Sequence, residues 1–69
     1  MNYLTKEQGN VVVNGLVNDP TITDYYFEEI LEHIRDDFCF HIRKYGYVNV
    51  DDLVEFHGYF VKEIIDRYL

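Results

Sequence analysis

Alanine, serine and tryptophan are absent from this 69-residue sequence, and Cys39 and Pro20 are the only residues of their kinds. A single cysteine excludes a disulfide within the chain and fits a reducing compartment. The absence of serine excludes a serine nucleophile. No apolar run approaches the roughly 20 residues of a membrane span. No signal peptide is recognisable in the first residues, so we expect a cytoplasmic protein.

Basic residues are also scarce. Six Lys and Arg stand against 13 Asp and Glu, which gives a formal net charge of -7. Phosphate groups are bound mainly by Lys and Arg, so this balance argues against nucleic acid or an anionic membrane as a direct partner. A protein with a basic surface is the better match.

Apolar residues make up 48% of the sequence, which is enough to form a core. The length predicts one domain, 1–69, near the lower limit of size for a self-sufficient core. Domains this small are commonly stabilised by very efficient helix packing or by a second copy of the chain. A homodimer is therefore expected as one way of enlarging the core.

Two helices are predicted after Pro20, over about 22–45 and 50–68, because apolar residues recur there with helical spacing. The stripe of the first helix is Phe27, Ile30, Leu31, Ile34, Phe38, Ile42 and Tyr45. The stripe of the second is Leu53, Phe56, Phe60, Val61, Ile64 and Tyr68. Gly46 is suited to end the first helix in a left-handed conformation, and Asn49 is suited to cap the second. The short connection predicts an all-α fold in which residues 21–69 form an antiparallel two-helix hairpin.

Residues 1–20 form a separate N-terminal element, and the sequence pattern fits either a helix or a β-hairpin there. Asn14-Gly15 between apolar residues is typical of a β-hairpin. Thr5-Lys6-Glu7-Gln8 is typical of the capping box that begins a helix. We favour a short third helix packed across the hairpin and keep the β-hairpin as the alternative.

Four residues with metal-binding side chains recur at four-residue spacing, namely Glu29, His33, Asp37 and His41. Adjacent pairs could supply half of a site for Zn²⁺ or another transition metal. His33 and His41, however, lie two turns apart, about 12 Å along a helix, which is too far to share one ion easily. We therefore interpret the set as solvated or salt-bridged neighbours. No metal and no cofactor are predicted.

Other reactive side chains also have simpler interpretations. His57, within the second apolar stripe, is interpreted as a buried neutral histidine with one hydrogen bond rather than as a pH switch. Cys39, between two phenylalanines, is interpreted as a packing residue. Acid–base catalysis by paired carboxylates needs a cleft that holds them in different environments, and a domain of this size has little room for one. We predict that the protein is not an enzyme.

The acidic residues are more informative. Residues 19–37 contain seven acids against one base, Arg35. Four of these acids recur every four residues: Asp24, Glu28, Glu32 and Asp36. Like charges at this spacing cost a few tenths of a kcal/mol per pair, and the helix dipole favours acids only in the first turn. The stripe is interpreted as a negative face that recognises a basic groove, and the alternative is a solvated face that maintains solubility.

Several aromatic and apolar residues fall outside both stripes, namely Tyr26, Cys39, Phe40, Tyr59 and Ile65. A two-helix hairpin has only one inner face, so these side chains need other contacts. The N-terminal element, a second copy of the chain or another protein would supply them.

The lack of Ala and the abundance of Asn, Ile and Tyr indicate a codon bias. In this bias, in size and in acidity, the chain resembles a class of phage-encoded inhibitors. Anti-CRISPR proteins and DNA mimics belong to that class. The resemblance implies a non-enzymatic protein that binds and inhibits or regulates another protein, such as a nucleic-acid-binding protein. The alternative is a structural or regulatory helical homodimer with no electrostatic target. The residues expected to bind the partner are Asp24, Glu28, Glu29, Glu32, Asp36, Asp37, Tyr26, Phe40 and Tyr59.

Overall fold

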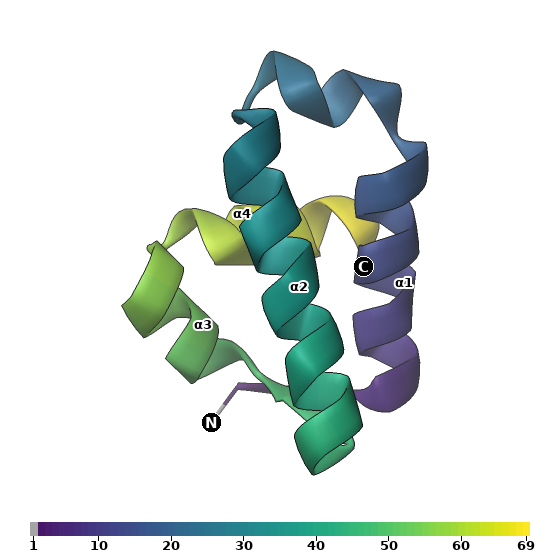
Figure 1. Ribbon diagram of the computed structural model, residues 1–69, viewed down its shortest axis with the longest axis vertical. Helices are drawn as coiled ribbons and strands as arrows, with labels where there is room; N and C mark the ends of the chain where they lie inside the picture. Colours follow the sequence, from purple (N-terminus) through teal and green to yellow (C-terminus); the bar gives the residue numbers. More distant parts are fainter. Residues whose placement is uncertain (1) are drawn as a thin grey trace.

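The computed structural model describes residues 2–69. Within this range the chain is mostly helical, with four α-helices and a small two-stranded sheet (Figure 1). The elements in chain order are β1 (Tyr3–Thr5), α1 (Lys6–Asn18), the 3-10 helix η1 (Pro20–Asp24), α2 (Glu28–Tyr45), β2 (Tyr47–Asn49), α3 (Val50–His57) and α4 (Phe60–Tyr68). The predicted helical class is confirmed, whereas the two short strands were not expected.

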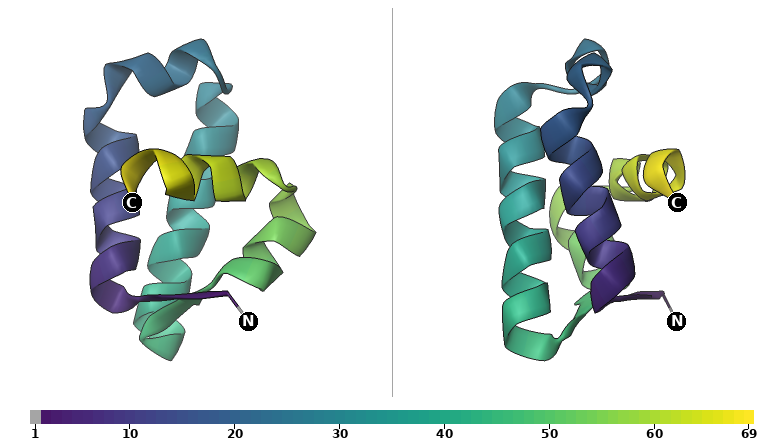
Figure 2. Two further views of the ribbon diagram at one scale, coloured as in Figure 1. Left: turned by 180° about the vertical axis from the view of Figure 1, so that it is seen from behind. Right: turned by 90° about the vertical axis from the view of Figure 1, so that its right-hand side faces the viewer.

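Helices α1 and α2 run antiparallel and side by side, and η1 joins them at one end of the molecule (Figure 1). At the other end, β2 pairs antiparallel with β1, and Leu4 lies opposite Val48. Helix α3 follows β2, and α4 then crosses the α1–α2 pair (Figure 2). The prediction of a hairpin made by helices 22–45 and 50–68 is therefore wrong in its pairing, because the antiparallel partner of α2 is α1.

Helix α1 begins with the predicted capping box. The Thr5 hydroxyl accepts a hydrogen bond from the Gln8 backbone N–H (3.1 Å), and the Gln8 side chain accepts one from the Thr5 N–H (2.9 Å). The helical alternative for the N-terminal element is thus confirmed, and the β-hairpin alternative is wrong. A Cβ atom added to Gly15 would lie 2.5 Å from the Tyr68 ring, so this glycine allows α1 and α4 to approach closely.

Helix α2 begins at Glu28, later than predicted, because the residues before it form η1. Asp19 accepts hydrogen bonds from both the backbone N–H (3.0 Å) and the hydroxyl (2.7 Å) of Thr21. The Thr23 hydroxyl donates to the Pro20 carbonyl (3.0 Å). The two threonines therefore stabilise the turn that connects α1 to α2.

The predicted helix over 50–68 is interrupted at Gly58, which has φ +124° and ψ 169°. This backbone region is accessible essentially to glycine alone. The interruption changes the helical phase, so α4 buries Ile64 and Ile65, whereas Phe56 in the last turn of α3 is 80% exposed. Two shorter helices thus meet at a corner where one long helix was expected.

Two predicted caps are confirmed. Gly46 has φ +79°, and its N–H donates to the Ile42 carbonyl (3.0 Å) at the end of α2. The Asn49 side chain accepts a hydrogen bond from the Asp52 N–H (3.2 Å) at the start of α3. Both caps depend on contacts within a few residues, which is why the local sequence predicts them.

The core is formed by side chains from all four helices, η1 and β2. Its buried members are Val12, Ile22, Leu31, Ile34, Phe38, Val48, Val50, Leu53, Val61, Ile64 and Ile65. Among residues 2–69, no helix has the length and apolar character needed to cross a membrane.

Candidate protein-interaction surface

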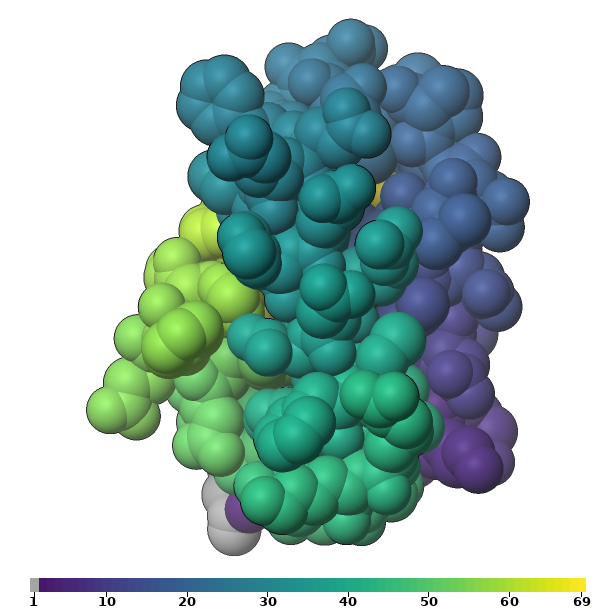
Figure 3. Space-filling model, in the orientation of Figure 1, coloured from purple at the N-terminus to yellow at the C-terminus, as the bar shows by residue number. Residues whose placement is uncertain are grey.

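An open groove of about 490 Å³ lies between α2 and the corner formed by α3 and α4. Its lining residues are Ile30, His33, Asp36, Asp37, Phe56, His57 and Phe60. We call it the α2–α3 groove. In the space-filling view, the teal surface of α2 meets the yellow-green surface of α3 and α4 along this side (Figure 3).

One wall of the groove is fixed by a hydrogen bond between α2 and α3. His57 Nε2 donates to Asp37 Oδ2 over 2.5 Å. The His57 side chain is only 10% exposed, and the Phe56 ring packs edge-on against it with 4.9 Å between ring centroids. As predicted, His57 is nearly buried and has this one hydrogen-bond partner. The contact holds the backbone of Phe56 in place at the groove.

Tyr26 supports the groove from behind. Its ring stacks on Phe60 with 5.4 Å between centroids, and its hydroxyl donates to Glu63 Oε1 over 3.0 Å. Burial, and next the hydrogen bond to Glu63, raise the pKa of the Tyr26 hydroxyl. Tyr26 is one of the residues expected to contact the partner, and in the structure its ring packs against Phe60 of the groove.

The most exposed phenylalanines are not the ones that the sequence pattern indicated. Phe27 and Phe56 are each 80% exposed and Ile30 is 37% exposed, although all three belong to the predicted inward stripes. The late start of α2 leaves Phe27 outside the helix as its N-cap, and the break at Gly58 turns Phe56 away from the core. Conversely, Ile65 was expected to lie outside and is buried.

The predicted acidic stripe is divided between the two sides of α2. Glu28 and Glu32 line a second groove towards α1 and η1, together with Arg35. Asp36 and Asp37 line the α2–α3 groove. Five of the six predicted acids are exposed, namely Asp24, Glu28, Glu29, Glu32 and Asp36. Asp37 is half-buried against His57. Carboxylates therefore lie on both sides of α2, and we call the exposed acids Glu28, Glu29, Glu32 and Asp36 the acidic ridge of α2.

Phe40 and Tyr59, the other two aromatic residues expected to bind the partner, lie outside the α2–α3 groove. Phe40 is 44% exposed near the C-terminal end of α2, where Lys44 Nζ lies 5.4 Å from its ring centroid. Tyr59 is 69% exposed at the corner between α3 and α4, where Lys62 Nζ lies 5.4 Å from its centroid. Neither ring joins the acidic residues of α2.

His33 and His41, the two histidines considered as metal ligands in the sequence, have different surroundings in the structure. His33 lines the α2–α3 groove, whereas His41 is 8% exposed and its Nδ1 accepts a hydrogen bond from the Asn49 N–H (3.2 Å). Across the described residues 2–69, no three His, Cys, Asp or Glu side chains gather where they could hold a metal ion. Cys39 is half-buried.

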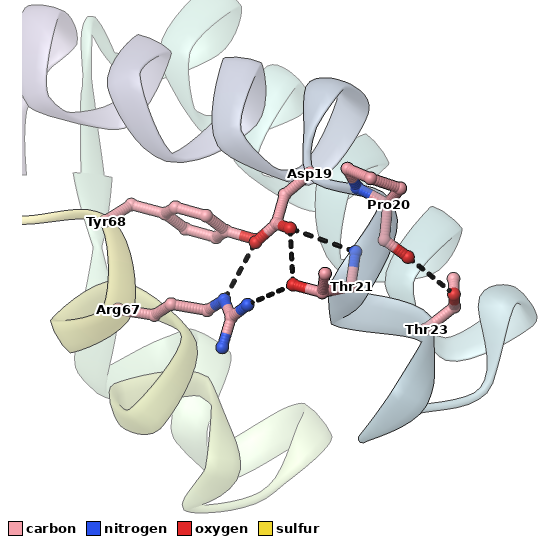
Figure 4. A network of polar contacts seen from close by, with 6 residues as sticks. All are labelled: Asp19, Pro20, Thr21, Thr23, Arg67 and Tyr68. Carbon is pink, nitrogen blue, oxygen red and sulfur yellow. Dashed lines mark hydrogen bonds and ion pairs between the residues drawn. The ribbon is translucent and has the colours of Figure 1, made fainter.

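A second polar cluster joins the α1–η1 corner to α4 (Figure 4). Asp19 Oδ2 accepts from Arg67 Nε (2.8 Å) and from the Tyr68 hydroxyl (3.0 Å), and Arg67 also donates to the Thr21 hydroxyl (2.6 Å). The hydrogen bonds from Arg67, and next those from Thr21, hold the pKa of Asp19 well below its usual range. We call this cluster the Asp19 clasp. Its donors and acceptors satisfy one another, as expected of a structural connection.

Sequence reasoning did not identify four of the groove's residues as a surface: Ile30, Phe56, His57 and Phe60. The single signal that pointed to the correct geometry was Gly58 within an otherwise helical pattern. A glycine in that position indicates a possible helix end.

Comparison with known proteins gives no matching family model, no matching curated protein and no matching solved structure. The groove and the charges around it are therefore the basis for proposing a function.

Proposed function

We propose that this chain binds another protein through the α2–α3 groove and the acidic ridge of α2, and that it thereby inhibits or regulates its partner. The observation that carries the proposal is the position of Phe56. Its ring is 80% exposed and lines the same groove as Asp36, whose side chain is 73% exposed. Exposed aromatic rings provide contact energy when an interface excludes water, and nearby carboxylates select a basic partner.

The charge distribution supports a basic partner. The net charge of -7 and the carboxylates on both flanks of α2 create a negative field that accelerates encounter with a positive surface. A ridge of carboxylates also presents negative charges in a row, as a nucleic-acid backbone does. The partner class that fits is a nucleic-acid-binding protein whose basic site the chain occupies, in the manner of a phage-encoded inhibitor or DNA mimic acting in the host cytoplasm. No reaction is proposed.

A homodimer is the second candidate, and the two phenylalanines at 80% exposure favour it. Self-association through the α2–α3 groove would bring Asp36 and Asp37 of one copy close to the same residues of the other. Repulsion between those carboxylates opposes such an arrangement. A basic partner in this groove avoids the repulsion and covers Phe56, so it is preferred.

Affinity capture from the native host tests the proposal. The bait is compared with two double variants of equal charge change, Glu29→Lys/Asp36→Lys on α2 and Glu7→Lys/Asp66→Lys elsewhere. We expect the first variant to lose the protein captured by the wild type, and the second to retain it, because only the first reverses charges on the acidic ridge. Circular dichroism establishes that both variants are folded. Equal capture by the two variants would exclude the acidic ridge as the binding surface.

Two further measurements separate the candidate functions. Duplex DNA that displaces the captured protein supports occupation of a nucleic-acid site, and the complex should weaken steeply with salt. Light scattering of the chain alone at micromolar concentration distinguishes a monomer from the homodimer.

A further inference from the structure

Four of the eight exposed aromatic residues among residues 2–69 have one of the chain's own cations over the ring. Lys44 lies over Phe40 and Tyr45, at 5.4 and 5.6 Å from the ring centroids. Lys62 lies 5.4 Å from the Tyr59 centroid. The Arg67 guanidinium lies 5.4 Å from the centroid of Tyr25, which is 69% exposed. Such contacts place a positive charge over the negative face of a ring.

The other four exposed rings, Tyr3, Phe27, Tyr47 and Phe56, have no such cation, and of these only Phe56 lines the α2–α3 groove. Over residues 2–69, no Lys or Arg lies above the Phe56 ring, and the residues that line the α2–α3 groove include no Lys and no Arg. The nearest internal cation to the groove's carboxylates is Arg35. It approaches Asp36 only to 4.0 Å, and it lines the groove on the opposite side of α2. The exposed Phe56 ring and the exposed Asp36 carboxylate thus line one groove without a Lys or Arg; the basic side chains of this groove are His33 and His57, and His57 is paired with Asp37.

The two aspartates of the groove are not equivalent. Asp37 directs Oδ2 to His57 and is half-buried, whereas the Asp36 side chain is 73% exposed. Asp36 is therefore the carboxylate that a partner's cation can reach with the least rearrangement. Ile30 and Phe60 add apolar surface that suits the methylene groups of a long basic side chain.

We propose that the α2–α3 groove receives an arginine side chain of the partner protein, with its guanidinium stacked on Phe56 and paired with Asp36. This inference rests on the proposed function and specifies what the groove recognises. Arginine fits better than lysine because its planar guanidinium stacks on an aromatic face while it donates two hydrogen bonds to a carboxylate. The groove thus selects partners whose basic surface presents an arginine next to aliphatic residues.

Three synthetic helical peptides provide the probe. They share one sequence of Leu and Gln and differ at two positions one turn apart, which carry Arg, Lys or citrulline. Citrulline keeps the shape of arginine and lacks its charge. Binding to the intact chain is followed by NMR titration. We expect the Arg peptide to shift the resonances of Ile30 and Phe56, and the citrulline peptide to bind about tenfold more weakly or worse.

Matched variants locate the contact. Phe56→Gln and Asp36→Asn should each weaken binding of the Arg peptide by about tenfold. Tyr59→Gln and Asp66→Asn are the controls at exposed positions outside the groove, and they should leave binding unchanged. Arg35→Gln removes the internal cation nearest Asp36 and should leave binding unchanged or strengthen it.

Several results would overturn the inference. Equal binding of the Arg and citrulline peptides would exclude charge recognition, and equal binding of the Arg and Lys peptides would exclude selection of a guanidinium. Equal effects of Phe56→Gln and Tyr59→Gln would exclude the stacking site. If Phe56→Gln converts a dimer to a monomer, a second copy occupies the groove instead. If the captured host protein binds Phe56→Gln normally but not Glu29→Lys/Asp36→Lys, the proposed function stands and the arginine site does not.

Discussion

The Oδ2 atom of Asp37 on α2 lies 2.5 Å from the Nε2 atom of His57 on α3, which follows it by 20 residues. The imidazole is nearly buried, with 10% of its side chain exposed, so the carboxylate satisfies a polar group that has little access to water. Asp36, the next residue towards the N-terminus, has 73% of its side chain exposed. The two adjacent aspartates therefore have different roles in the fold.

Replacing Asp37 with alanine should lower the free energy of unfolding by about 1–3 kcal/mol, because His57 loses its hydrogen-bond acceptor. Asp36→Ala should change it by less than about 0.5 kcal/mol, as is usual for exposed positions. Urea denaturation followed by circular dichroism measures both. In the double variant Asp37→Ala/His57→Ala the costs should be less than additive. Equal destabilisation by the two single aspartate substitutions would contradict the assigned roles.

The exposure of Phe56 predicts that its ring contributes little to stability. Phe56→Gln should change the free energy of unfolding by less than about 0.5 kcal/mol. Phe38 is fully buried, so the milder change Phe38→Leu should cost about 1–1.5 kcal/mol. The comparison uses thermal unfolding of the two variants. If Phe56→Gln lowers the free energy of unfolding more than Phe38→Leu does, the Phe56 side chain belongs to the core and is not available in the α2–α3 groove.

The Asp19 clasp predicts a dependence of stability on pH. The hydrogen bonds from Arg67 and Thr21 place the pKa of Asp19 in the folded protein below its unfolded value of about 3.9. The stabilisation is therefore fully present above the unfolded pKa, and it decreases as the pH falls from there through the folded pKa. Urea denaturation of Asp19→Asn and the wild type should differ clearly at neutral pH, and the difference should shrink below about pH 4.

The control for the clasp is Asp24→Asn, at an exposed position on η1, the 3-10 helix that Asp19 caps. This variant should follow the wild-type pH dependence closely. An Asp19→Asn variant that loses stability equally at neutral and acidic pH would show that the carboxylate's charge is not what stabilises the clasp.

Local signals in the sequence account for the parts of the fold that were predicted correctly. The capping box at Thr5 and Gln8, the left-handed Gly46 and the Asn49 cap each involve atoms within four residues of one another. Such contacts depend on residue type and spacing alone, so periodicity and capping rules identify them. For this reason the sequence predicts the helical content and the end of α2 at Tyr45 correctly.

Long-range contacts account for what was missed. The Asp19 clasp joins residues 46 to 49 positions apart, and strands β1 and β2 pair residues 42 to 46 positions apart. Helical spacing cannot predict such contacts, because many distant acids and bases in one sequence are equally plausible partners. The helix wheel also assumed one continuous helix over 50–68. That assumption placed Phe56 inside and Ile65 outside, the reverse of what the structure shows.

The position that reversed this assignment is Gly58, and its substitution provides the sharpest test of the fold. With φ +124° and ψ 169°, it occupies a region that other residues adopt at a cost of about 1–3 kcal/mol. Gly46, at φ +79° and ψ 8°, lies in the left-handed helical region, which asparagine tolerates. Gly58→Asn should therefore destabilise the protein by about 1–3 kcal/mol. Gly46→Asn should cost less than about 1 kcal/mol.

Urea denaturation compares the two glycine variants, and NMR of Gly58→Asn reports where its chain relaxes. A straightened helix over 50–68 would turn Ile65 out of the core, which opposes straightening. We therefore expect Gly58→Asn to lose stability without a gain in helix content. The α2–α3 groove depends on the same corner, and binding of the Arg peptide should weaken with it. Equal costs at the two glycines would mean that the break between α3 and α4 does not require glycine, and the corner would then have to be maintained by the packing of α4 alone.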